Sequence, residues 1–153
     1  MGFFWTIVAL VVTLGLAWRF IGSYMAGVFE GRVTFLAWLE RPFYRLLGTS
    51  PEKEQTWKRY AGSMIIFSGT LLIVGYLVIR IQGSLPLNPQ HLGAVPQALT
   101  FNTVASFMTN TNWQNYAGEL SMSYFSQIGV LAVEQFVSAA VGIAAAIAVT
   151  RGF

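Results

Sequence analysis

The sequence predicts an all-α membrane protein with three transmembrane helices and one short helix that goes only partway across the bilayer. Of its 153 residues, 55% are hydrophobic and 10% are charged, against about 25% charged residues in soluble domains. Three long stretches, residues 1–18, 61–79 and 120–150, are uncharged apart from Glu134. A shorter apolar stretch followed by polar residues lies between the second and the third. These three observations define the fold class.

The distribution of basic residues predicts the orientation in the membrane. Six of the nine Lys and Arg residues lie between Arg32 and Arg59, whereas residues 81–122 contain none. Lys and Arg are concentrated in cytoplasmic loops. We therefore expect residues 30–59 and Arg151 in the cytoplasm, and the N-terminus and residues 81–122 outside.

The same distribution argues against a nucleic-acid partner, although the calculated pI is 9.5. The basic residues belong to one segment beside the membrane. Such a segment meets anionic lipid headgroups or a cytosolic partner subunit.

Residues 1–29 are expected to form an N-terminal transmembrane helix. Arg19 follows the apolar run instead of preceding it, and no small-x-small cleavage site stands out after Trp18. A retained helix therefore fits better than a cleaved signal peptide.

Residues 30–59 are expected to form a basic cytoplasmic segment, in which aromatic side chains alternate with Arg. This mixture suits a segment lying at the membrane interface, and a packed cytosolic loop is an equal alternative. Thr49–Glu52 has the composition of a helix start, with Pro51 in the first helical position. That helix is expected to run through Trp57 into the second span.

Residues 60–153 are expected to form one helix–pore-loop–helix unit, with spans at 60–80 and 123–150 and a pore helix and filter at 96–114. Residues 61–79 would extend about 28 Å as a helix, close to a hydrocarbon core of about 30 Å. Pro96 to Met108 would extend only about 20 Å, yet this segment is too apolar for a solvated loop. A re-entrant pore half-helix fits both facts. A surface amphipathic helix is the alternative.

The polar residues after this short helix are candidate ion ligands. Polar backbone at membrane depth is tolerated only where it is buried in protein or lines a cavity, and ion filters replace the hydration shell with backbone carbonyls. Such a filter needs some positive φ angles, which Asn tolerates better than most residues. The helix C-terminus, which is partially negative, also favours a cation. The predicted ion-binding residues are Thr109, Asn110, Thr111, Asn112 and Gln114.

Three other residues, Glu119, Glu134 and His91, have polar side chains in or beside the apolar segments. Glu119, the one acid in the outer segment, either caps the third helix, which we favour, or raises the local cation concentration. Glu134 is an intramembrane acid, and a structural role facing the bundle interior is favoured over ion binding. His91 has no acid–nucleophile arrangement beside it, so no enzyme active site is expected. The sequence also lacks a Gly-rich loop followed by Lys and an aspartyl-phosphate motif, so any ATP must be handled elsewhere.

Several strings of this sequence resemble one known family. TNTNWQNYAGELSMSYFSQ (109–127), LPLNPQ (85–90) and FVSAAVGIA (136–144) are similar to the potassium-binding A subunit of the bacterial Kdp potassium-transporting ATPase. ERPFYRLLG (40–48) and WKRY (57–60) resemble that family's first cytoplasmic loop. The resemblance covers essentially the whole chain, which looks like an N-terminal portion, roughly a quarter of the family's usual length.

The resemblance implies a potassium uptake pump of the bacterial inner membrane, whose pore is built from four helix–pore-loop–helix units. Thr109–Asn112 would form the first quarter of its selectivity filter, with Gln114 just behind. The bound ion would be potassium, with no organic cofactor. The chain would not be an enzyme by itself. It would work with a P-type B subunit that hydrolyses ATP, a C subunit and a small F subunit. Glu134 departs from this pattern, because the family more commonly has an amide there.

Two other functions fit the residues. A passive potassium channel or secondary cation transporter would need the same pore-loop architecture, because a filter does not reveal its energy source. A non-transporting membrane scaffold subunit would leave residues 96–114 as an external surface loop.

Overall fold

The structure, a computed structural model, describes residues 2–50 and 53–152. Within these residues the protein is helical and contains no β-strand, as predicted. The chain divides into two compact units, residues 1–54 and residues 55–153.

The first unit begins with an unbroken helical run from Gly2 to Phe29. It consists of α1 (Gly2–Ala17), a π-helical segment (Trp18–Gly22) and α2 (Ser23–Phe29). Its 28 residues are long and apolar enough to cross a membrane. Arg19 does not end the helix: its guanidinium donates a hydrogen bond to Ser23 Oγ, one turn later, at 3.1 Å.

The first unit also contains α3 (Ala37–Leu47). Gly48 ends α3 with a left-handed φ of 60°, and the next N–H, that of Thr49, donates to Tyr44 O at 3.0 Å. This arrangement satisfies helix carbonyls that would otherwise lack partners. The exposed side chains of α3 include large apolar ones, among them Trp38 and Phe43.

The helix that contains the second span starts later than residues 49–52, where the sequence indicated a helix start, and includes the whole predicted span 60–80. Residues 53–56 are not helical, and α4 (Trp57–Arg80) begins at Trp57. Thr56 caps this helix, because its side-chain oxygen accepts a hydrogen bond from the Arg59 N–H at 3.4 Å. The part of the prediction that concerned Pro51 and Glu52 lies outside the described residues.

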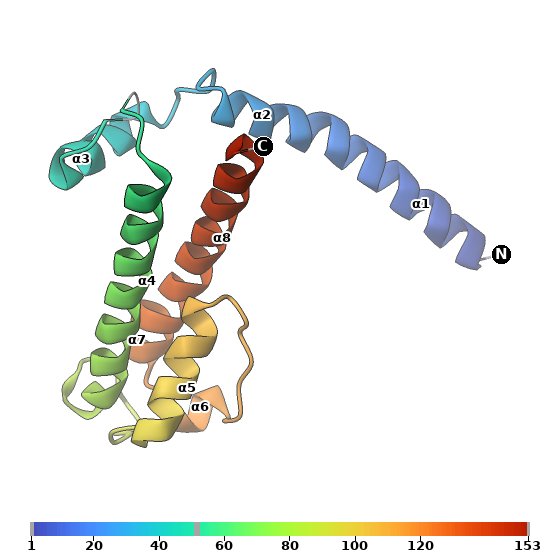
Figure 1. Ribbon diagram of the computed structural model, residues 1–153. Coiled ribbons are helices and arrows are strands. Elements are labelled where there is room, and N and C mark those ends of the chain that lie inside the picture. The colour runs from blue at the N-terminus through green and yellow to red at the C-terminus, as the bar shows by residue number, and fades with distance from the viewer. Residues whose placement is uncertain (1, 51–52, 153) are drawn as a thin grey trace. The chain divides into compact units, whose positions relative to one another are not determined.

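The second unit is built around α4, α5 (Gln97–Met108) and a long C-terminal helix. The last comprises α7 (Tyr124–Ser126), a π-helical segment (Gln127–Ala132) and α8 (Val133–Gly152). In Figure 1, α5 starts at the Arg80 end of α4 and runs back alongside it. The segment 109–117 then returns to the end from which α5 started, where the short α6 (Gly118–Ser121) lies.

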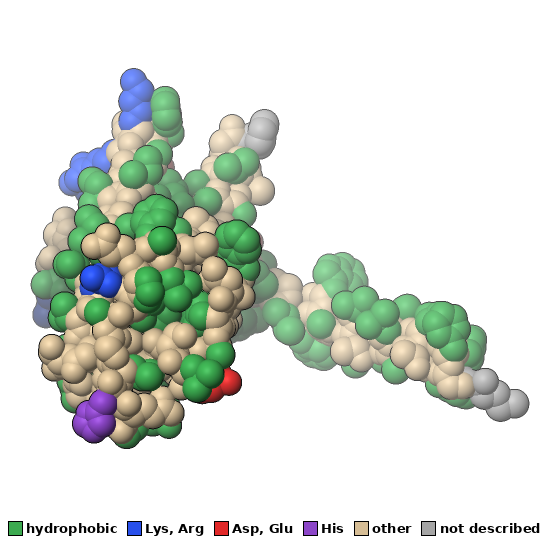
Figure 2. All heavy atoms as spheres, turned by 90° about the horizontal axis from the view of Figure 1, so that it is seen from below, with side chains coloured by type: hydrophobic (Ala, Val, Ile, Leu, Met, Phe, Trp, Pro, Cys, Tyr) green, Lys and Arg blue, Asp and Glu red, His purple; other side chains and the backbone are tan. Residues whose placement is uncertain are grey.

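Apolar side chains cover much of the surface instead of gathering inside, as Figure 2 shows. Three helices, Gly2–Phe29, Trp57–Arg80 and Tyr124–Gly152, are long and apolar enough to span a bilayer, which confirms the predicted class. The buried apolar core is small and belongs to the second unit. It consists of Ile79, Val95, Val104, Phe107, Met122, Val130 and Leu131.

Candidate ion-binding loop

The residues after α5 fold back onto its C-terminus through their backbone N–H groups. The Asn110 N–H donates to Phe107 O at 3.0 Å. The N–H groups of Thr111 and Asn112 both donate to Ser106 O, at 2.9 Å and 3.2 Å. The last carbonyls of a helix have no partner within the helix itself. Here the loop supplies those partners, so the loop and the helix end form one hydrogen-bonded structure.

This folding turns the loop carbonyls outward. In a planar trans peptide unit the C=O points opposite to the N–H, and the N–H groups of residues 110, 111 and 112 point at the end of α5. The carbonyl oxygens of Thr109, Asn110 and Thr111 therefore point away from that helix. Across residues 2–50 and 53–152, no hydrogen bond reaches these three oxygens or that of Asn112. The loop thus presents four consecutive backbone oxygens as open acceptors.

The backbone adopts the positive φ angles that the sequence indicated. Asn110 has φ 59° and Asn112 has φ 57°, a region that costs most other residues free energy. The side chains pair two residues apart, because Asn112 Nδ2 donates to Asn110 Oδ1 at 3.2 Å. The hydroxyls of Thr109 and Thr111 lie 2.9 Å apart. These pairs fix the alternating Thr–Asn sequence in one conformation.

The outward face of the loop is open in this chain. Thr109, Asn110, Thr111 and Gln114 are exposed, and no hydrogen bond to the Gln114 side chain occurs among the described residues. Asn112 is half-buried, and its Oδ1 has no hydrogen-bond partner in the described part of the chain. The predicted site residues therefore lie together on one loop, with unused polar groups on the same segment.

Ser106 is a site residue that the sequence did not reveal. It is 3% exposed, its carbonyl accepts two loop N–H groups, and its hydroxyl donates to Trp113 O at 3.0 Å. It therefore holds the segment from residue 111 to residue 113 against α5. A Ser in an apolar helix one turn before a polar loop is the only local signal of this role.

Tyr116 anchors the middle of the returning segment. Its ring packs against the hydrophobic core, and burial raises the pKa of its phenol. The Tyr116 side chain therefore stays neutral at physiological pH and ties the loop to the core by packing.

Glu134 faces the interior of the second unit, as expected for a structural residue. It is 2% exposed, and neither carboxylate oxygen has a hydrogen-bond partner among the described residues. Its Oε1 faces Gly75 of α4, where a side chain would collide with it. Val104 and Val130 line the same contact. None of the hydrogen bonds in the described ranges joins Glu134 to residues 109–112.

The expected capping role of Glu119 is wrong. Glu119 lies in the separate short helix α6. The long C-terminal helix is instead capped by Ser123, whose hydroxyl oxygen accepts a hydrogen bond from the Ser126 N–H at 3.2 Å. The hydroxyl lies at the first turn of that helix, whereas Glu119 is four residues too early to reach it.

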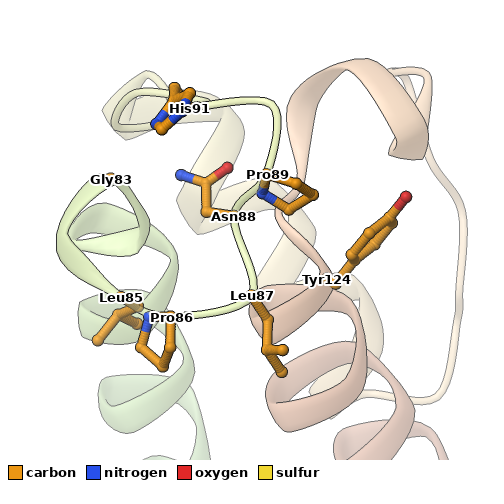
Figure 3. A pocket seen from close by; sticks show the side chains of 8 residues that line it. All are labelled: Gly83, Leu85, Pro86, Leu87, Asn88, Pro89, His91 and Tyr124. Atoms are coloured by element: carbon orange, nitrogen blue, oxygen red, sulfur yellow. The ribbon is translucent and has the colours of Figure 1, made fainter.

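A hollow of about 540 Å³ lies in the connection between α4 and α5, and is separate from the loop (Figure 3). In the view shown, Leu85 and Pro86 lie on one side of it, Leu87 and Pro89 in the middle, and Tyr124 on the other side. His91 lines it with a φ of 53°. Its lining contains no carboxylate and none of residues 109–114, so we assign the candidate ion site to the loop and not to this hollow.

Three membrane-length helices and a short helix whose following loop leaves four carbonyls open define a multi-pass membrane protein with a candidate cation site. The sequence profile of the family described as "Potassium-transporting ATPase A subunit" matches residues 7–153. The chain belongs to this family.

Individual relatives agree with this assignment. Proteins named potassium-transporting ATPase potassium-binding subunit are 52% identical over 144 residues in Mesorhizobium japonicum and 49% identical over 147 residues in Ralstonia pickettii. These alignments cover 92% and 94% of this chain, and 25% of each relative. A relative of the same name from Pseudomonas aeruginosa is 49% identical over 137 residues, covering 87% of this chain and 24% of its own length. The chain thus spans about a quarter of the length of the curated relatives it matches.

Proposed function

We propose that this chain is part of the potassium-binding and translocating subunit of an ATP-driven, high-affinity potassium uptake pump. Its loop 109–112, with Gln114 behind it, contributes part of the selectivity filter on the extracellular side. In this proposal α5 is a re-entrant half-helix, because it starts and its loop returns at the same end of α4.

One observation carries the proposal: the row of open carbonyls at Thr109–Asn112. Potassium that enters a narrow pore must exchange its water for other oxygens, and backbone carbonyls are the usual substitutes. The N–H bonds of residues 110–112 to the end of α5 turn the carbonyls of residues 109–111 away from that helix, where they are open to an ion. The C-terminus of α5 also places partial negative charge at this point. Both features suit a desolvated monovalent cation.

The proposed roles of the other segments, their orientation in the membrane and the partner subunits follow from the family and from the charge pattern. Residues 1–29 form an added span, residues 30–59 a cytoplasmic segment, and residues 60–153 one of several pore units in the bacterial inner membrane. The N-terminus and the loop lie outside, and Arg151 lies inside. ATP is hydrolysed on a separate P-type B subunit, with C and F subunits completing the complex. The names of the relatives, which refer to a potassium-transporting ATPase, support this arrangement.

The substitution Asn112→Asp tests the proposal in the assembled pump. Asn112 Nδ2 donates to Asn110 Oδ1, and a carboxylate would replace this donor with an acceptor facing another acceptor. We expect the apparent potassium affinity of ATP hydrolysis and uptake to fall by about fivefold or more, since breaking such a contact costs on the order of 1–3 kcal/mol. The matched control is Asn115→Asp, which makes the same chemical change at an exposed position nearby.

The outcomes separate the three candidate functions. If the apparent potassium affinity of an assembled Asn112→Asp complex is unchanged, the loop does not bind the ion, and a non-transporting scaffold subunit is favoured. Potassium uptake that continues in the complete complex after ATP is withdrawn would favour a passive channel or a secondary transporter over the pump.

A further inference from the structure

The side chain of Gln82 joins three segments of the second unit. It lies just beyond the outer end of α4 and is 0% exposed. Its Nε2 donates to Gly93 O at 2.7 Å and to Ser121 O at 2.9 Å. Its Oε1 accepts from the Ser123 N–H and from Ser126 Oγ, both at 3.0 Å. Both donors and both lone pairs of the amide are thus used.

Three of these partners, Ser121, Ser123 and Ser126, lie at the exit of the candidate ion-binding loop, and Gly93 lies in the connection between α4 and α5. Ser121 ends α6, and Ser123 and Ser126 form the cap of the long C-terminal helix. Ser106 holds the entrance of the same loop, up to Trp113. Among the described residues, no backbone hydrogen bond attaches residues 114–116 to the rest of the protein. The path of the loop is therefore set by its two ends and by the packing of Tyr116.

We infer that Gln82 is a positioning residue for potassium selectivity, which it controls by fixing the exit of the loop 109–117. This inference rests on the proposed function of that loop. Gln82 acts at a distance and contacts no ion. In water, solvent would replace any hydrogen bond that this amide lost. Because the amide is fully buried, its four protein partners must stay within hydrogen-bond distance, which fixes the separation between α4 and the loop exit. A small shift of that exit changes the alignment of the carbonyls.

The test is Gln82→Met in the assembled pump, with the ratio of apparent potassium to sodium affinity as the readout. Methionine has a similar length but cannot form the four hydrogen bonds. We expect the ratio to fall by about tenfold or more, with a much smaller change in the maximal rate of ATP hydrolysis. A residue needed only for folding would lower the amount of assembled complex and leave the ratio unchanged. The matched control is Gln90→Met, at an exposed Gln of the same connection.

A milder variant keeps the test decisive if Gln82→Met does not assemble. Ser126→Ala removes one of the two donors to Gln82 Oε1, and we expect it to lower the ratio by about threefold. An assembled Gln82→Met or Ser126→Ala pump with the parental ratio overturns the inference.

The proposed function is judged separately through Asn112→Asp. If Asn112→Asp changes potassium affinity and the Gln82 and Ser126 variants leave the ratio of potassium to sodium affinity unchanged, only the role of Gln82 is refuted. If Asn112→Asp also leaves the potassium affinity unchanged, the proposed function of the loop is refuted as well.

Discussion

Replacing Asn110 and Asn112 together with Val is expected to abolish potassium discrimination in the assembled pump, whereas Gly at the same two positions is expected to lower it much less, because it loses only the Asn112–Asn110 side-chain hydrogen bond. Both residues have φ near +60°. A non-Gly residue in this region costs about 1–3 kcal/mol, and a β-branched side chain is among the least tolerant. Two Val residues would therefore disfavour the observed loop by about 2–6 kcal/mol. Glycine adopts these angles without strain.

The measurement is the competition of sodium with potassium in ATP hydrolysis and uptake. A strained position outside the loop provides the control: His91, in the connection between α4 and α5, has φ 53°. We expect His91→Val to reduce stability and leave ion discrimination intact. If the double Val variant discriminates as the parent does, the loop backbone does not contact the ion.

The second large effect is expected from Gly75→Ala in α4. A Cβ at this position would collide with Glu134 Oε1 and would lie 3.0 Å from Val130 Cγ1 and 3.2 Å from Val104 Cγ1. Because protein interiors are close-packed, such overpacking costs about 1–3 kcal/mol. Val104, which belongs to the helix that carries the candidate loop, would have to shift by a few tenths of an ångström. We expect a lower thermal stability of the purified complex and weaker potassium binding.

Two further variants show whether this contact is the cause. Gly69→Ala lies on the same helix with nothing within 4 Å of its added Cβ among the described residues, so it should keep the parental stability or gain up to about 1 kcal/mol. Glu134→Ala removes the group that the new methyl would strike. Combining it with Gly75→Ala should recover part of the lost stability, because contacting sites are not additive. Strict additivity of the two changes would contradict the packing seen here.

The long-range pattern of the sequence predicted the spans, because membrane crossing depends on length and hydropathy alone. The residue type of Asn110 and Asn112 predicted their positive φ angles, and these angles are observed. The expected helix from residues 49–52 into the second span was wrong, because residues 53–56 are not helical and Thr56 makes the capping bond of α4. Local pattern alone does not rank two such signals.

The roles of Ser106 and Gln82 could not be predicted from the sequence. Gln82 bonds to residues 39 to 44 positions away, and a polar residue at the end of an apolar helix is common whether or not it has partners. Ser106 resembles any small helix residue until the loop is seen to fold back onto its carbonyl. Glu134 was identified from its intramembrane position, but its contact with Gly75 depends on how α4 packs against the C-terminal helix.

The most direct test of the potassium site is to locate a heavy potassium substitute, rubidium or thallium, by anomalous scattering in crystals of the complete pump. We predict a peak beside the backbone carbonyls of Thr109–Asn112, on the side that faces away from α5. The same peak should weaken in the double Val variant. Well-occupied ion peaks elsewhere in the subunit, with none in contact with these carbonyls, would contradict the assignment of this loop to the potassium path.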